Sequence, residues 1–187
     1  MRWMFMKWKG AAVLIARYGY KPIFQYKFRP AAQAGLPLDG GFSVLLYENG
    51  ILSFSTYDAS GAFLDELCFS LPGRVLQCFY SLLRNASSWL PSTPCDLRGP
   101  KDSPFGSSFA FDGYDPIRVW GMNDLLCEPC GSARGFFARH LYVLFEDVCN
   151  VLAEYGLNLS LDGFTWTDRI RPFRKNQLRV SAQQNVI

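Results

Sequence analysis

A hairpin signal at residues 42–57 most constrains how this 187-residue chain can fold. Two runs rich in apolar and aromatic residues, FSVLLY and ILSFSTY, flank Glu48-Asn49-Gly50. Asn49 and Gly50 predict a type I′ turn, because both tolerate the positive φ angles that this turn requires. The second run alternates between two faces, as a strand with one face more buried does. The sequence therefore predicts an antiparallel strand pair here.

Further strands are predicted on both sides of this hairpin. Residues 13–18 and 23–28 are β-branched and aromatic runs separated by Gly19 and Pro22. A third strand of the first group is expected at residues 62–69. A second hairpin is expected at 107–120, around the turn Asp112-Gly113-Tyr114-Asp115-Pro116, and a short strand at 157–161. The proline-rich residues 87–104 predict a long irregular connection.

Two helices are expected between these strands. The longer covers residues 132–155, where apolar side chains recur every three or four positions until Gly156. The shorter is predicted to start with Ser70 as N-cap and Pro72 in its first turn, and to stop at Asn85. The predicted fold class is α+β, with an antiparallel sheet of about five to seven strands and the two helices packed on one face.

Charge is distributed unevenly along the chain, whose length predicts a single domain. Residues 1–30 carry seven Lys or Arg and no acid, and residues 168–187 carry five bases and one acid. Subtraction from the totals of 19 bases and 16 acids leaves 7 bases and 15 acids in residues 31–167, a net charge of −8. We expect a domain over residues 1–167, with 1–12 as an N-terminal extension and 168–187 as a flexible basic tail.

Localisation and partners are constrained by the same composition. No run approaches the ~20 apolar residues of a membrane span. The apolar run at residues 11–16 is too short for a signal peptide and lacks a convincing cleavage site. We therefore expect a cytoplasmic protein with free thiols and no membrane partner. An acidic body repels phosphate, so nucleic acid is not the expected partner, although RNA binding by the basic ends stays open as an alternative.

The cysteine pair Cys127 and Cys130 has a spacing with chemical content, since two thiolates two residues apart can share a zinc ion or form a redox pair. A structural zinc needs four ligands, which His140 and Cys149 could complete. Their spacing matches no finger pattern, and nine residues place them on different turns of the long helix. We expect no metal and no cofactor, with Cys127, Cys130, His140 and Cys149 kept as an alternative site.

Catalytic signals are otherwise few. A Ser or Cys nucleophile usually needs a histidine base, and the single histidine, His140, lies beside the apolar stripe of the long helix. No nucleotide-binding fingerprint occurs. Paired acids can catalyse hydrolysis, but turn aspartates more often bond to the backbone. We therefore name no catalytic residue, and we expect a partner-binding surface formed by Asp112, Tyr114, Asp115, Asp124 and Glu128.

The ordered segments KPIFQYKF, FSVLLYENGILSFSTY, LPGRVLQCFYSLL, FGSSFAFDG, IRVW and EYGLNLSL resemble a group of small uncharacterised proteins common in Gram-positive anaerobic bacteria. The resemblance covers about residues 16–161. Its motifs are structural, so it implies an α+β fold and no catalytic residues. In size and acidity the chain is also similar in general character to immunity proteins, which neutralise a toxin by plugging its active site.

The leading hypothesis is a non-enzymatic, cytoplasmic protein-binding module, immunity-like in character, whose acidic face meets a basic protein partner. One alternative is a metal-dependent or thiol enzyme that uses Cys127, Cys130 and the nearby carboxylates. Another is an RNA-binding protein that uses the basic termini.

Overall fold

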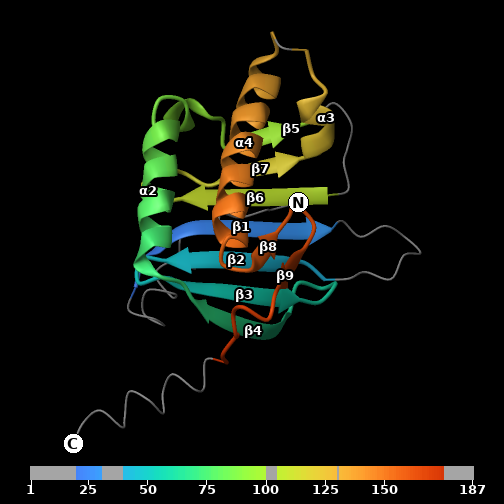
Figure 1. Ribbon diagram of the computed structural model, residues 1–187. Helices are drawn as coiled ribbons and strands as arrows, with labels where there is room; N and C mark the ends of the chain where they lie inside the picture. The colour runs from blue at the N-terminus through green and yellow to red at the C-terminus, as the bar shows by residue number, and fades with distance from the viewer. Residues whose placement is uncertain (1–19, 31–39, 100–104, 130, 175–187) are drawn as a thin grey trace, which may run out of the picture.

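A seven-stranded sheet forms the centre of the computed structural model, which describes residues 20–30, 40–99, 105–129 and 131–174 (Figure 1). Its spatial order is β4-β3-β2-β1-β6-β7-β5, and all neighbours are antiparallel except β5 and β7. The strands are β1 (Pro22–Pro30), β2 (Phe42–Tyr47), β3 (Ile51–Tyr57), β4 (Phe63–Ser70), β5 (Asp96–Arg98), β6 (Phe105–Phe111) and β7 (Ile117–Trp120). The predicted α+β class with a mostly antiparallel sheet is confirmed.

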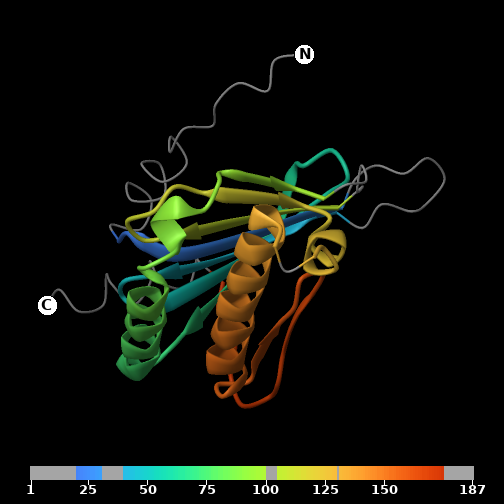
Figure 2. The same cartoon turned by 90° about the horizontal axis from the view of Figure 1, so that it is seen from above.

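The described helices include two substantial ones, which run beside each other in Figures 1 and 2. A short two-stranded sheet follows the second of them and lies next to it. The elements are α2 (Gly73–Ala86), the 3-10 helix η1 (Leu90–Ser92), α3 (Met122–Leu126), α4 (Ala133–Ala153), β8 (Leu157–Leu159) and β9 (Phe164–Trp166). No helix in the described part of the chain is long and apolar enough to cross a membrane.

Aromatic side chains connect the sheet to the two long helices. Phe79 of α2 lies with its ring centre 5.6 Å from that of Phe24 on β1. Phe145 of α4 lies 4.7 Å from Tyr26 on β1 and 5.4 Å from Phe109 on β6, measured between ring centres. All five side chains are at most 2% exposed. They form the centre of the hydrophobic core.

The turn between β2 and β3 differs from the predicted type I′ turn. The N–H of Gly50 donates to the carbonyl oxygen of Tyr47 at 2.9 Å, and Gly50 has a φ of 81°. No non-glycine residue in the described part of the chain has a positive φ, so Asn49 does not adopt the predicted conformation. The prediction of a type I′ turn is wrong, because a three-residue loop needs only its last residue in the left-handed region.

The helix boundaries correct one further prediction and confirm another. Ser70 is the last residue of β4, and the N-cap of α2 is Pro72 rather than Ser70. The long helix begins as predicted, since the Ser132 side chain accepts a hydrogen bond from the N–H of Gly135 at 3.3 Å. The connection expected to be irregular after α2 contains η1 and β5. The predicted strand at 13–18 and the extension at 1–12 lie outside the described residues.

The segment after β9 is held at the edge of the sheet. Phe173 and Cys68 of β4 exchange two backbone hydrogen bonds of 2.9 Å each. Arg174 adds a contact of 3.2 Å between Nη2 and the Asp65 carboxylate. Phe173 and Arg174, expected to belong to a flexible tail, therefore take a hydrogen-bonded position beside β4, while residues 175–187 lie outside the described residues.

Candidate functional site

A cavity of about 320 Å³ lies between α2 and α4, and we call it the α2–α4 groove. Its floor includes Ala86 and Leu144, which are 3% and 5% exposed. Its walls are formed mainly by Leu82 and Asn85 of α2, Trp89 after α2, and His140, Val143 and Asp147 of α4.

Helical spacing places these wall residues in line. Leu82 and Asn85 are three residues apart on α2, and His140, Val143 and Asp147 follow one another at intervals of three and four residues on α4. Side chains at this spacing lie on one face of a helix. Each helix therefore lines the groove with the stripe next to its buried stripe. The sequence contains this spacing, but it does not show that the two stripes face each other.

His140 is held in the groove by aromatic neighbours. Its ring centre lies 4.0 Å from that of Phe136 and 5.5 Å from that of Trp89. Its Nδ1 lies 2.9 Å from the carbonyl oxygen of Phe136, so Nδ1 carries the proton in this contact. With one nitrogen bonded to its own helix, His140 forms part of an aromatic wall of the groove.

The rim of the groove carries charges of both signs. Arg139 donates from Nη1 to the carbonyl oxygen of Glu128 at 2.9 Å, which ties α4 to the segment that follows α3. Asp147 is exposed, and it forms no salt bridge within the described part of the chain. The rim therefore leaves one carboxylate available to a cation from outside.

The alternative metal ligands are not brought together within the described residues. Cys127 is exposed just after α3, His140 lies in the groove, and Cys149 is half-buried on α4. Nine residues of helix separate His140 from Cys149 by about 13 Å along the axis, whereas zinc bonds are about 2.0–2.3 Å long. Cys130 lies outside the described residues. Elsewhere in the described chain, no three His, Cys, Asp or Glu side chains are grouped closely enough to hold a metal.

Cys149 is poorly suited to thiolate chemistry. Burial raises the pKa of its thiol from 9.0 to about 12, and the charge of Glu146 adds to this shift. The nucleophilic form of cysteine is the thiolate, which this site disfavours at neutral pH. The thiol-enzyme alternative thus receives no support from Cys149.

The raised pKa of Cys149 predicts an alkaline loss of stability. The folded protein binds the Cys149 thiol proton more tightly than the unfolded chain does, because the folded-state pKa lies above the ordinary value of 9.0. This contribution to the free energy of unfolding is fully present below about pH 9 and is lost as the pH rises from about 9 to 12. We expect the free energy of unfolding of the wild type to fall more steeply than that of Cys149→Ala over this range. Urea unfolding from pH 8 to 11 under reducing conditions measures both.

The exposed Cys78 provides the control, since Cys78→Ala should follow the wild-type pH dependence. Tyr26, whose pKa burial also raises, is present in all three proteins and cancels in the comparison. A constant difference between wild type and Cys149→Ala at every pH would contradict the prediction.

The first group of predicted partner-binding residues lies at the turn between β6 and β7. Asp112 is ion-paired with Lys21, which precedes β1. Tyr114 is half-buried and packs against the core, whereas Asp115 is exposed. Of the two aspartates in this group, Asp115 is the exposed one, and the carboxylate of Asp112 is already paired with Lys21.

The second group lies around α3, at the other end of β6 and β7 in Figure 1. Asp124 is half-buried within α3. Glu128 is 9% exposed, accepts a hydrogen bond from the Ser132 hydroxyl and pairs with Arg134 at 3.2 Å. These contacts hold the start of α4. The five residues therefore do not gather into one acidic surface, because the strands between the two groups separate them.

No protein-family model matches the chain, and a comparison with curated proteins finds no significant match.

Proposed function

We propose that the protein is a non-enzymatic protein-binding module and that its partner docks in the α2–α4 groove. The observation that carries this proposal is the exposure of apolar side chains on α4 at the groove. Val143, in its wall, is 56% exposed, and Phe136, whose ring lies against that of His140, is 42% exposed. Exposed apolar groups around a cavity favour a binding surface, because their burial by a partner releases water.

The geometry favours an amphipathic helix as the docking element. Two adjacent helices leave a groove that a third helix can fill with side chains spaced three and four residues apart. A volume of about 320 Å³ suits one or two large apolar side chains. In this proposal α2 and α4 pack together on the Tyr26 side of the sheet and present their outer surfaces to the partner.

Charge favours a basic partner. Asp147 at the rim can pair with a Lys or Arg that flanks the apolar anchor of the docking helix. The net charge of −8 over residues 31–167 would speed the encounter with such a protein. This keeps the immunity-like hypothesis while moving its contact surface from the predicted acidic residues to the groove. A cytoplasmic location is part of the proposal, since it suits the free thiols of Cys78, Cys95, Cys127 and Cys149.

The test compares two substitutions of exposed apolar residues. Val143→Asp places a charge in the groove, and Leu64→Asp places the same charge on β4, where Leu64 is 62% exposed. Proteins recovered from native lysate by the wild type and by Leu64→Asp, but not by Val143→Asp, are candidate partners. The affinity of each purified candidate for the three chains is then measured by titration calorimetry.

We expect Val143→Asp to weaken binding at least about 10-fold and Leu64→Asp to leave it unchanged, because a buried unpaired carboxylate removes an interface contact and adds desolvation. Circular dichroism confirms that both variants fold. Equal affinities for wild type and Val143→Asp, or recovery of the same proteins by both, would rule out the groove as the docking site.

A further inference from the structure

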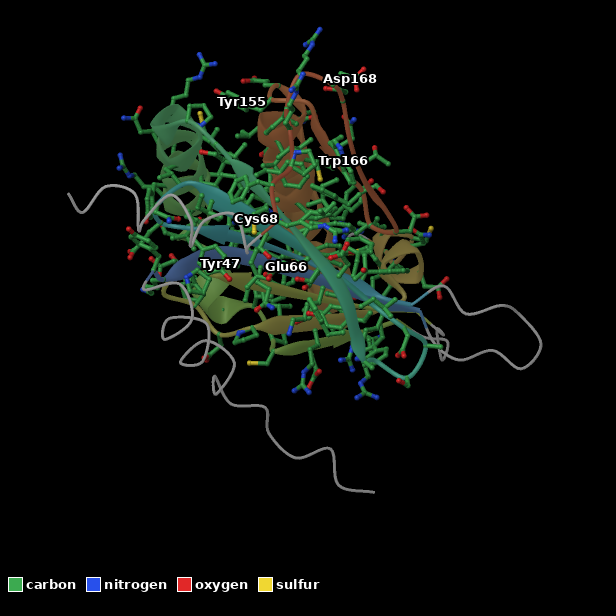
Figure 3. All side chains as sticks on the ribbon, turned by 90° about the horizontal axis from the view of Figure 1, so that it is seen from below. Tyr47, Glu66, Cys68, Tyr155, Trp166 and Asp168 are labelled. Carbon is green, nitrogen blue, oxygen red and sulfur yellow. The ribbon has the colours of Figure 1, made fainter. Side chains whose placement is uncertain are left out.

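A polar row crosses the sheet on the side opposite Tyr26. Lys27 follows Tyr26 on β1, so its side chain points to the other face. Direct register partners extend the row from β5 to β4 through Asp96, Arg118, Ser108, Lys27, Ser43, Ser55 and Glu66. Figure 3 shows Glu66 on the sheet, away from Tyr155 and Trp166. The middle of the row is buried, with Ser43 at 0% and Ser55 at 5% exposure.

The charged groups at the two ends of the row have polar partners. Arg118 Nε lies 3.1 Å from the Asp96 carboxylate. Glu66 accepts a hydrogen bond of 2.7 Å from the hydroxyl of Ser53. Both ends of the row therefore have partners among the described residues, and the centre of the row carries the positive charge of Lys27.

Two cations stand at that centre without a carboxylate. Within the described part of the chain, neither Lys27 nor Arg29 forms a salt bridge. They lie on the same face of β1, roughly 7 Å apart along the strand. Burial lowers the pKa of the Lys27 ammonium, and the charge of Arg29 lowers it further. Arg29 is exposed, so the cost in folding free energy is that of partly burying the Lys27 ammonium beside a second positive charge, and a bound anion would recover it.

Hydroxyl groups surround the same position. Ser43 and Ser108 are the direct partners of Lys27 on the two neighbouring strands, where paired Cβ atoms lie about 4.5–5.5 Å apart. The hydroxyl oxygen of Ser43 also lies within hydrogen-bond distance, 3.1 Å, of the hydroxyl oxygen of Tyr57. Ammonium, guanidinium and hydroxyl donors together form the kind of donor set that binds phosphate oxygens.

We propose that Lys27 and Arg29 bind the phosphate group of a small phosphorylated molecule, with Ser43 and Ser108 as additional hydrogen-bond donors. The acidic body of the protein disfavours a long polyanion but not a single phosphate group. Among the undescribed residues, 1–19 and 175–187 contain no Asp or Glu, and the remaining undescribed segments contain the carboxylates of Asp39 and Asp102, which the test below addresses. This site lies on the opposite side of the sheet from the core residues that contact α4, so it is independent of the proposed docking groove.

Thermal unfolding of the full chain tests the site with inorganic phosphate and pyrophosphate against sodium chloride at equal ionic strength. Lys27→Met removes the central charge and keeps an apolar stem. Arg118→Gln removes a cation of the same row that already has its carboxylate. We expect pyrophosphate to raise the Tm of the wild type and of Arg118→Gln by at least about 3 °C, because a ligand that binds only the folded state stabilises it.

Lys27→Met should be at least as stable as the wild type in chloride, and pyrophosphate should not raise its Tm. Calorimetry should show at least about 10-fold weaker pyrophosphate binding by Lys27→Met. An equal Tm gain in Lys27→Met would reveal a general salt effect and overturn the proposal, as would no gain in the wild type. Loss of stability in Asp39→Asn or Asp102→Asn without any phosphate effect would assign the counter-charge to that carboxylate of the chain and also overturn the proposal. Val143→Asp should retain the phosphate response, which separates this test from that of the groove.

Discussion

Replacing Phe145 with alanine is expected to lower the free energy of unfolding by about 3–5 kcal/mol, the usual cost of truncating a buried aromatic side chain. Phe145 is 2% exposed, and its ring contacts Tyr26 and Phe109 on adjacent strands. The alanine variant would lose these contacts and leave a cavity between α4 and the sheet. Urea unfolding followed by circular dichroism at pH 7 measures the change.

Phe136→Ala provides the matched control, since it is the same substitution on the same helix at a side chain that is 42% exposed. Its free energy of unfolding should change by less than about 1 kcal/mol. Comparable losses in the two variants would mean that Phe145 does not hold α4 on the sheet as its contacts indicate.

Replacing Gly50 with alanine is expected to lower the free energy of unfolding by about 2 kcal/mol or more, because two costs add at this turn. The φ of 81° is unfavourable for any residue with a Cβ. An added Cβ would also lie 2.7 Å from the carbonyl oxygen of Leu71. Gly50 cannot move away freely, since its own carbonyl oxygen accepts a 2.9 Å hydrogen bond from the N–H of Leu71.

The control for this prediction is Gly73→Ala. Gly73 opens α2, and an added Cβ there meets no atom within 4 Å. Alanine at this position should leave stability unchanged or raise it by up to about 1 kcal/mol, because alanine favours helix more than glycine does. Chemical unfolding of both variants gives the comparison. If Gly50→Ala were as stable as Gly73→Ala, the turn would have to adopt another conformation.

The local sequence pattern predicts some features of the candidate site and misses others. His140 was expected to lie beside the apolar stripe of the long helix, and in the structure it lies on α4 against Phe136 and Trp89. The groove itself was not predicted, because its two walls come from helices almost fifty residues apart in sequence. Asp112 and Glu128 were grouped because they are close in sequence, yet they lie at opposite ends of β6 and β7.

The sequence alone determined the elements whose signals act over a few residues. Ser132, the apolar stripe and Gly156, with its φ of 83°, define α4, and the residues around Gly50 define a hairpin even though its turn type was wrong. Only the tertiary structure decided that β1 lies between β2 and β6, that β5 runs parallel to β7, and that Lys27 and Arg29 share a face without a carboxylate partner within the described residues. Local periodicity and turn chemistry depend on neighbours along the chain. Strand order and side-chain partners depend instead on which distant apolar faces are buried against each other.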